Sequence, residues 1–156
     1  INLLLETIRS RCQQIRFKPF SNNTLTEFIY KNENASDEKK HIIQNLIFIS
    51  NGSPGKLKKN LDNWRKIPTE IKSKIGSPLI NYYIAFSLAK DISDNLDFKS
   101  QYFLINYLQY SWWRISKDKN IVQILDGIGF NLKNNLSPRL SWEVGLLKII
   151  IKDYKF

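Results

Sequence analysis

The sequence predicts an all-α fold, and three observations support this. From residue 20 onward, apolar residues recur every three or four positions, the spacing of helices that bury one face. Polar cap residues precede these stretches, and in three places the cap is a serine followed by proline. With 156 residues, 42% of them hydrophobic, the chain can bury a sizeable core. We expect a three-helix bundle followed by a domain of about five helices.

A short strand remnant is expected before these helices. Residues 3–5 form an apolar run that would end a buried strand, and apolar and charged residues alternate over residues 15–18, up to Pro19. The chain opens on an apolar run and contains no Met. We interpret it as a fragment of a longer protein whose missing part is N-terminal.

The first two short helices are expected between residues 20 and 50. Thr24 and Glu27 fit a capping box at the start of the first helix. Ser36 is a candidate cap for the second helix, with the two acidic residues that follow in its first turn. The apolar stripe of this second helix consists of Ile42, Ile43, Leu46 and Ile47.

The third short helix follows a stop signal. Asn51 and Gly52 would end the helix before it, and Ser53 followed by Pro54 would start the new one. Its apolar residues are Leu57, Leu61 and Trp64. A boundary between the bundle and the longer helices is expected just after, before Pro68.

The helices of the second half begin with similar signals. Pro68 and Gly76 bound a short helix, Ser77 and Pro78 open one that extends to about residue 95, and Asp97 opens one that extends to about residue 116. Its aromatic residues are Phe98, Tyr102, Phe103, Tyr107, Tyr110, Trp112 and Trp113. Such a cluster is more typical of core packing or a subunit contact than of base stacking.

Two more helices are expected at the end. The first, with Ile121, Ile124, Leu125 and Ile128, is interrupted by Gly127 and Gly129. Ser137 and Pro138 open the last one. Its apolar stripe is Leu140, Val144, Leu147 and Ile151.

The composition excludes several classes of function. No phosphate-binding loop or dinucleotide-binding glycine pattern is present. One cysteine, Cys12, and one histidine, His41, cannot make an ordinary zinc site or an intrachain disulfide, so we expect no metal and a reducing, cytoplasmic location. The longest apolar runs are far shorter than the ~20 residues of a membrane helix. Residues 91, 94 and 97 are aspartates, which we interpret as helix-end groups.

The net charge of +10 suits a negatively charged partner such as nucleic acid. The basic residues are spread along the chain, however, which is equally typical of a solvated surface. A stand-alone helical nucleic-acid-binding module therefore remains an alternative.

Two short stretches carry a more specific signal. The stretch at residues 7–13, which contains Ser10-Arg11-Cys12, follows the apolar run at residues 3–5. Residues 52–56 read Gly52-Ser53-Pro54-Gly55-Lys56 at the start of the third helix. In this order and spacing they resemble the clamp-loader AAA+ ATPases of DNA replication, and most closely the delta-prime type of subunit in bacterial DNA polymerase III. The segment from Asn135 to Leu147 also resembles the last helix of that family's collar domain.

The resemblance implies a domain plan and a role for Arg11. Residues 1–19 would be the end of the ATPase core, 20–64 its lid and 65–156 a collar for oligomerisation. Arg11, with Ser10 and Cys12 as motif neighbours, would be an arginine finger that reaches the ATP of a neighbouring subunit. A guanidinium suits this role because it stays charged and donates two bonds to phosphate oxygens. Arg9 is the nearby rival.

The second stretch departs from the family pattern. ATP-binding clamp-loader subunits carry an arginine two residues after the Gly-Ser pair, where this chain has Gly55. The resemblance therefore implies a degenerate nucleotide-sensing motif at residues 52–56. The fragment would hold no cofactor, and ATP and magnesium would be bound by neighbouring subunits.

The implied partners are the gamma/tau and delta subunits in a pentamer, with the sliding clamp and primed DNA as partners of the whole complex. The fragment would have no activity of its own. The parent would belong to a DNA polymerase holoenzyme, a nucleotidyltransferase by assignment, and to an ATPase complex. A gamma/tau-type ATPase subunit is the alternative within the family, and the missing arginine counts against it.

Overall fold

The computed structural model describes residues 11, 13, 17–32, 39–76 and 81–153, and all regular structure within them is helical. The helices are α2 (Asn22–Asn32), α3 (Lys40–Ile49), α4 (Pro54–Lys66), α5 (Thr69–Lys74), α6 (Tyr82–Asn95), α7 (Phe98–Ser116), α8 (Lys119–Lys133) and α9 (Pro138–Asp153). The all-α prediction is confirmed. Phe17 and Lys18 lie in irregular backbone, and the other residues of the expected strands lie outside the described part of the chain.

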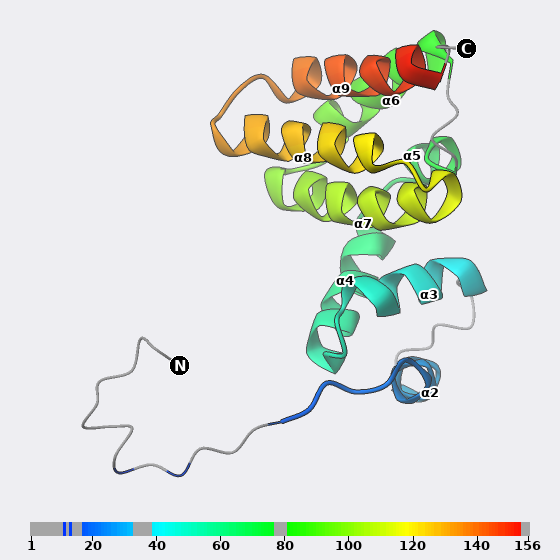
Figure 1. The fold of residues 1–156 in the computed structure, drawn as a ribbon, viewed down its shortest axis with the longest axis vertical. Helices are drawn as coiled ribbons and strands as arrows, with labels where there is room; N and C mark the ends of the chain where they lie inside the picture. Colours follow the sequence, from blue (N-terminus) through cyan, green and yellow to red (C-terminus); the bar gives the residue numbers. More distant parts are fainter. Residues whose placement is uncertain (1–10, 12, 14–16, 33–38, 77–80, 154–156) are drawn as a thin grey trace.

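Helix α7 connects the two ends of the molecule. Helices α2, α3 and α4 pack against one another at one end, and α6, α8 and α9 lie at the other (Figure 1). Helix α7 contacts α8 on one side and α3 and α4 on the other, while α9 packs against both α6 and α8. The short helix α5 packs against α6.

The starts of the first two helices differ from the sequence expectation. Helix α2 is capped by Ser21, whose Oγ accepts a hydrogen bond from the Thr24 backbone N–H at 3.2 Å. Thr24 therefore lies inside the first turn, and the predicted capping box with Glu27 is wrong. Helix α3 begins at Lys40 without an acidic residue in its first turn, which corrects that expectation too. Ser36 lies outside the described residues.

Helix α6 also begins later than expected. It starts at Tyr82, after Asn81, whose Oδ1 accepts a hydrogen bond from the Ile84 N–H at 2.8 Å. The side-chain cap thus comes from Asn81, four residues after Ser77. The predicted start signal itself, Ser77 with Pro78, lies outside the described residues. The predicted end near residue 95 is confirmed.

Helix α7 begins after Asp97, as predicted. The Asp97 carboxylate accepts a hydrogen bond from the Ser100 N–H at 2.8 Å. Hydrogen bonds from Ser100 stabilise the ionised form and hold the pKa of the Asp97 carboxyl below its usual value.

Helix α8 runs through both of its glycines without a break, so the predicted interruption is wrong. Glycine disfavours a helix interior by about 1 kcal/mol relative to alanine, and the burial of four large apolar side chains offsets that cost. These side chains are Ile121, Leu125, Ile128 and Leu132. Gly129 also faces α7, where a Cβ atom would lie 3.5 Å from the Tyr102 ring.

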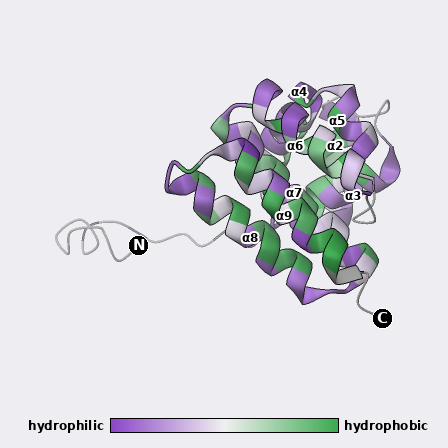
Figure 2. Cartoon of the chain, turned by 90° about the horizontal axis from the view of Figure 1, so that it is seen from above, coloured by the Kyte–Doolittle hydropathy of each residue, from purple (hydrophilic) through white to green (hydrophobic). Residues whose placement is uncertain are grey.

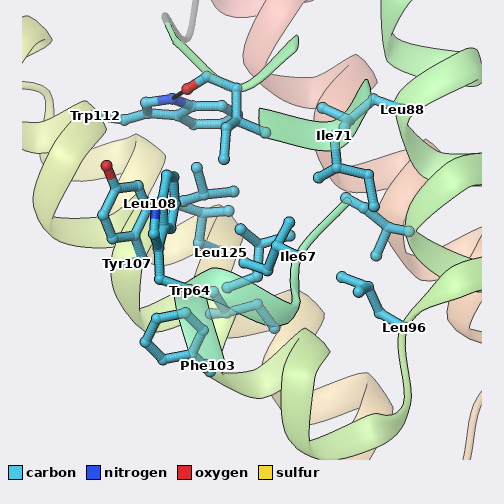
Figure 3. Packing of buried hydrophobic residues seen from close by; sticks show 14 of the residues in the cluster. Trp64, Ile67, Ile71, Leu88, Leu96, Phe103, Tyr107, Leu108, Trp112 and Leu125 are labelled. Carbon is cyan, nitrogen blue, oxygen red and sulfur yellow. Dashed lines mark hydrogen bonds between the residues drawn. The ribbon is translucent and has the colours of Figure 1, made fainter. Parts of the chain in front are cut away.

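The hydrophobic core is continuous from α2 to α9. At the junction of the two ends, the rings of Trp64 on α4 and Tyr107 on α7 lie 4.5 Å apart between centroids (Figure 3). The Trp112 indole N–H donates to the Ile75 carbonyl oxygen at 3.0 Å, so the large side chain is buried without an orphaned polar atom. The core thus spans the boundary expected between residues 63 and 68.

Candidate functional site

The sequence-predicted stretch at residues 52–56 forms a tight turn between α3 and α4. Asn51 and Gly52 both have left-handed backbone conformations, with φ angles of 49° and 75°. A Cβ atom on Gly52 would lie 2.4 Å from the Pro19 Cβ, a distance that real structures essentially never show. The turn therefore requires glycine at position 52, both for its backbone and for the close approach of the preceding chain.

The same turn starts α4 and holds the segment that leads into α2. The Ser53 Oγ accepts a hydrogen bond from the Lys56 N–H at 3.3 Å, and Pro54 occupies the first helical position. The Phe20 N–H donates to the Gly52 carbonyl oxygen at 2.9 Å. The cap predicted at Ser53 and Pro54 is confirmed. Both Ser53 and Gly52 of the turn accept hydrogen bonds from neighbouring backbone N–H groups.

The position of the missing arginine is open. Gly55 is exposed, and a Cβ atom there would meet nothing within 4 Å. Lys56 is exposed too. The turn therefore has space for a longer side chain at residue 55, but the chain provides none.

Arg11 lies in a turn and its side chain is exposed. Its motif neighbours Ser10 and Cys12, and the rival Arg9, lie outside the described residues. The structure thus assembles residues 52–56 into one local unit but brings no described residue of that unit into contact with Arg11.

Helix α9 leaves much of its predicted apolar stripe exposed. Of its apolar stripe, Leu140 is 59% exposed, Val144 41% and Ile151 52%. The helix buries its other face, through Trp142, Leu146, Ile149 and Ile150. A sequence signal for this was available, because apolar residues occur on more than one face of the helix.

Further exposed apolar residues lie on α8 and in the connection between α8 and α9. Phe130 is 67% exposed, and Leu136 in the connection between the helices is 52% exposed. A groove of about 500 Å³ runs between α8 and α9, with Ile124 and Val144 among its lining residues. Figure 2 shows the two helices side by side, both rich in hydrophobic residues. We call these exposed residues, Phe130, Leu136, Leu140, Val144 and Ile151, the α8–α9 face.

Gly145 allows the two helices to approach closely. A Cβ atom at this position would lie 2.4 Å from the Ile128 Cδ1 atom. Because α9 is pinned to α8 and α6 by its buried face, the α8–α9 face cannot turn inward without breaking that packing.

The described part of the chain contains neither a possible metal cluster nor a helix that could cross a membrane. No three residues among its His, Cys, Asp and Glu side chains come together as a possible metal site. None of its helices combines the length and apolar character needed to cross a membrane.

Exposed apolar residues on a rigid helical scaffold are typical of a contact with another protein. The described part of the chain is an all-helical domain that carries such residues on α8, α9 and the connection between them. The chain belongs to the family described as cyanobacterial DNA polymerase III delta prime, C-terminal domain, whose model matches residues 24–149. Comparison with curated proteins and with solved structures finds no significant match.

The family match confirms the resemblance seen in the sequence. It identifies the chain as part of a clamp-loader subunit of DNA polymerase III, which associates with the other subunits of that assembly. The matched residues include the turn at 52–56 and most of α9, whereas Arg11 lies outside them. Because the family is that of delta prime, it supports neither the gamma/tau-type subunit nor the stand-alone nucleic-acid-binding module.

Proposed function

We propose that the α8–α9 face holds this subunit in a clamp-loader pentamer with gamma/tau and delta subunits. The observation that carries this proposal is the exposure of Leu140, Val144 and Ile151 on a helix whose opposite face is buried. An apolar face left in water is unfavourable by roughly 25 cal/mol per Å², and covering it with a partner recovers that free energy. The complex would use ATP to load the sliding clamp onto primed DNA in the cytoplasm.

In this proposal, residues 20–64 form the lid, 65–156 the collar, and 1–19 the end of the ATPase core. The division is supported by the packing of α2, α3 and α4 against one another and by the greater length of most helices after α5. The continuous core implies that the lid and collar act as one rigid support for the subunit contacts.

A double substitution, Leu140→Asp with Val144→Asp, tests the assembly role in the full-length subunit. Leu140 lies in the first turn of α9, where an acidic residue is favourable to the helix. We expect the variant to fold normally but to lose co-purification with its partner subunits. Deleting residues 137–156 is a less clean test, because it also removes the buried Trp142.

Tyr30→Asp on α2 is the matched control, since Tyr30 is 41% exposed, as Val144 is. It should leave assembly unchanged. If the double variant co-purifies with its partners as wild type does, or if Tyr30→Asp disrupts assembly equally, the assignment of the α8–α9 face is wrong.

We further propose that Arg11 acts as an arginine finger toward ATP and magnesium bound by a neighbouring subunit. Its exposure in the described structure is compatible with that reach, and the Ser10-Arg11-Cys12 sequence is the basis of the assignment. Arginine fingers of this kind accelerate hydrolysis about 10³–10⁵-fold at the site to which they contribute. The nucleotide-sensing turn at residues 52–56 would be degenerate, with Gly55 in place of the arginine.

Arg11→Ala in the full-length subunit, reconstituted with its partners, tests the finger. We expect normal assembly and impaired clamp- and DNA-stimulated ATP hydrolysis, with Arg9→Ala as the control. The steady-state loss will be smaller than that at one site, because other sites in the complex do not depend on Arg11. Hydrolysis and clamp loading at wild-type rates, or a defect confined to Arg9→Ala, would refute it.

A further inference from the structure

A basic groove lies where α3, α5 and α7 meet, separate from both the turn at residues 52–56 and the α8–α9 face. Its volume is about 450 Å³. Lys39 and His41 line it from the start of α3, Lys72 from α5 and Arg114 from α7. None of its lining residues is an aspartate or a glutamate. Four residues that carry or can carry positive charge therefore converge on one concave site.

These charges are not neutralised by the described part of the chain. No described carboxylate forms an ion pair with Lys39, Lys72 or Arg114. The Lys72 Nζ atom lies 5.3 Å from the centroid of the Trp64 ring, a contact that leaves its charge uncompensated. An anion in the groove would supply the missing negative charge.

The start of α3 adds backbone donors to the same site. Lys39 is the N-cap residue, and its side chain makes no capping hydrogen bond. The first turn carries no acidic residue. The first N–H groups of the helix, at Lys40 and His41, therefore have no side-chain acceptor in the described structure, and the partial positive charge of the helix end favours an anion here.

An unpartnered amide in the groove independently indicates a ligand. Asn45 lines the groove one turn after His41 and is only 1% exposed. Its Nδ2 donates to the Tyr107 hydroxyl at 3.3 Å, and its Oδ1 has no partner among the described residues. Such atoms are rare, because burying an unsatisfied polar group costs about 1–3 kcal/mol.

A half-turn of the Asn45 amide would place Nδ2, a hydrogen-bond donor, where the unpartnered Oδ1 now lies. An oxyanion that reached this buried position would then give the amide the partner that it lacks.

We propose that this groove binds a phosphate group, either that of a free phosphate compound or that of a DNA backbone. Cations from three helices, two backbone N–H groups and one amide match the several oxygens and the double charge of phosphate. The arginine can contribute a two-pronged contact, whereas the lysines act as point charges. The site is independent of the clamp-loader proposal, since none of its residues belongs to the α8–α9 face or to the segment around Arg11.

Titration of the complete chain with inorganic phosphate tests the site, with sodium chloride holding the ionic strength constant. The readouts are the NMR signals of the Lys40 and His41 backbone amides and of the Asn45 side-chain amide. We expect saturable shifts confined to these and neighbouring groups. Shifts spread evenly over the basic surface, or none at these groups, would overturn the proposal.

Charge-matched variants separate the groove from the general positive charge. Lys72→Gln with Arg114→Gln removes two groove charges, and Lys90→Gln with Lys99→Gln removes two exposed charges that do not line the groove. We expect phosphate binding to weaken by about tenfold or more in the first variant, the loss of one or two charged hydrogen bonds. The second should stay within about twofold of wild type. Equal weakening in both would overturn the site.

A short oligo-dT, titrated under the same conditions, distinguishes the two sources of phosphate. If the groove takes a DNA backbone, the oligonucleotide will bind more tightly than inorganic phosphate, and the groove variant will lose that advantage. If it takes a free phosphate compound, the oligonucleotide will cause no greater shift at Lys40 and His41 than inorganic phosphate does.

Discussion

Helices α3 and α9 each carry a predicted stripe of four apolar residues at helical spacing. Most of the α3 stripe is buried, whereas most of the α9 stripe is exposed. On α3, Ile43, Leu46 and Ile47 are buried. On α9, Leu140, Val144 and Ile151 are exposed, and a second set of apolar residues is buried instead. Helical spacing therefore indicates that a face is apolar, but a neighbouring helix decides whether that face is covered.

The difference follows from how many apolar faces each helix has. Helix α3 exposes mainly polar residues, Lys40, His41 and Gln44. Its one strongly exposed apolar side chain among the described residues is Phe48, which is 50% exposed and stacks on the Tyr110 ring of α7. Helix α9 has two apolar faces, and the face with Trp142 packs inward. That face buries the largest side chain, and the Trp142 indole N–H donates to the Gln101 Oε1 at 3.0 Å. The stripe that remains outside is free to bind a partner.

The largest expected effect comes from removing the anchor of the buried α9 face. Trp142→Ala should lower the free energy of unfolding by about 3–5 kcal/mol, because it leaves a cavity. It also leaves the buried Gln101 Oε1 without its donor. Urea unfolding followed by circular dichroism measures the change. A loss below about 1 kcal/mol would mean that α9 packs through its other face.

The next effect tests the buried stripe of α3. Leu46 is fully buried, and Leu46→Ala should cost about 2–5 kcal/mol of unfolding free energy. The same urea titration applies, with Gln44→Ala on the exposed side of α3 as a control expected to change little. Similar losses in both variants would show that the helix is not anchored by one face.

Leu140→Asp tests whether the α9 stripe is exposed in the free chain. Because Leu140 is 59% exposed, this change should alter the unfolding free energy of the chain by no more than about 0.5 kcal/mol. Thermal unfolding of the chain without partners measures this. A loss above about 2 kcal/mol would indicate that the α9 stripe is buried in the free chain. That result would contradict the contrast between α9 and α3.

The smallest effect concerns a cap outside either stripe. The pKa of Asp97 lies below its ordinary value of 3.8, so its ionised form is favoured in the folded chain. Its contribution to stability is thus present above the unfolded pKa and is lost as the pH falls through the folded pKa. Asp97→Asn should be slightly less stable than wild type at neutral pH and equal to it at strongly acidic pH. A difference that grows as the pH falls would contradict this sign.

Local features were predictable wherever neighbouring residues determined them. Ser53 with Pro54 starts α4, Asp97 caps α7, and Asn51 with Gly52 ends α3, because each depends on backbone groups within a few residues. The cap of α2 was predicted at Thr24, but Ser21 holds that position, three residues earlier in the chain.

The resemblance to the clamp-loader family was also accessible from local sequence, since it depended on two short stretches and their spacing. The basic groove was not, because Lys39, Lys72 and Arg114 lie on three helices that only the fold brings together. No periodicity relates residues that far apart in the chain.

The sequence by itself thus determined the helical class, most helix boundaries, the glycine turn and the absence of the arginine at Gly55. Tertiary structure decided which face of α9 is buried, why α8 continues through Gly127 and Gly129, and which basic residues converge. The physical reason is the distance along the chain over which each kind of interaction acts. Caps and turns are set by hydrogen bonds over three or four residues, whereas burial depends on the shape of distant surfaces that must pack at crystal-like density.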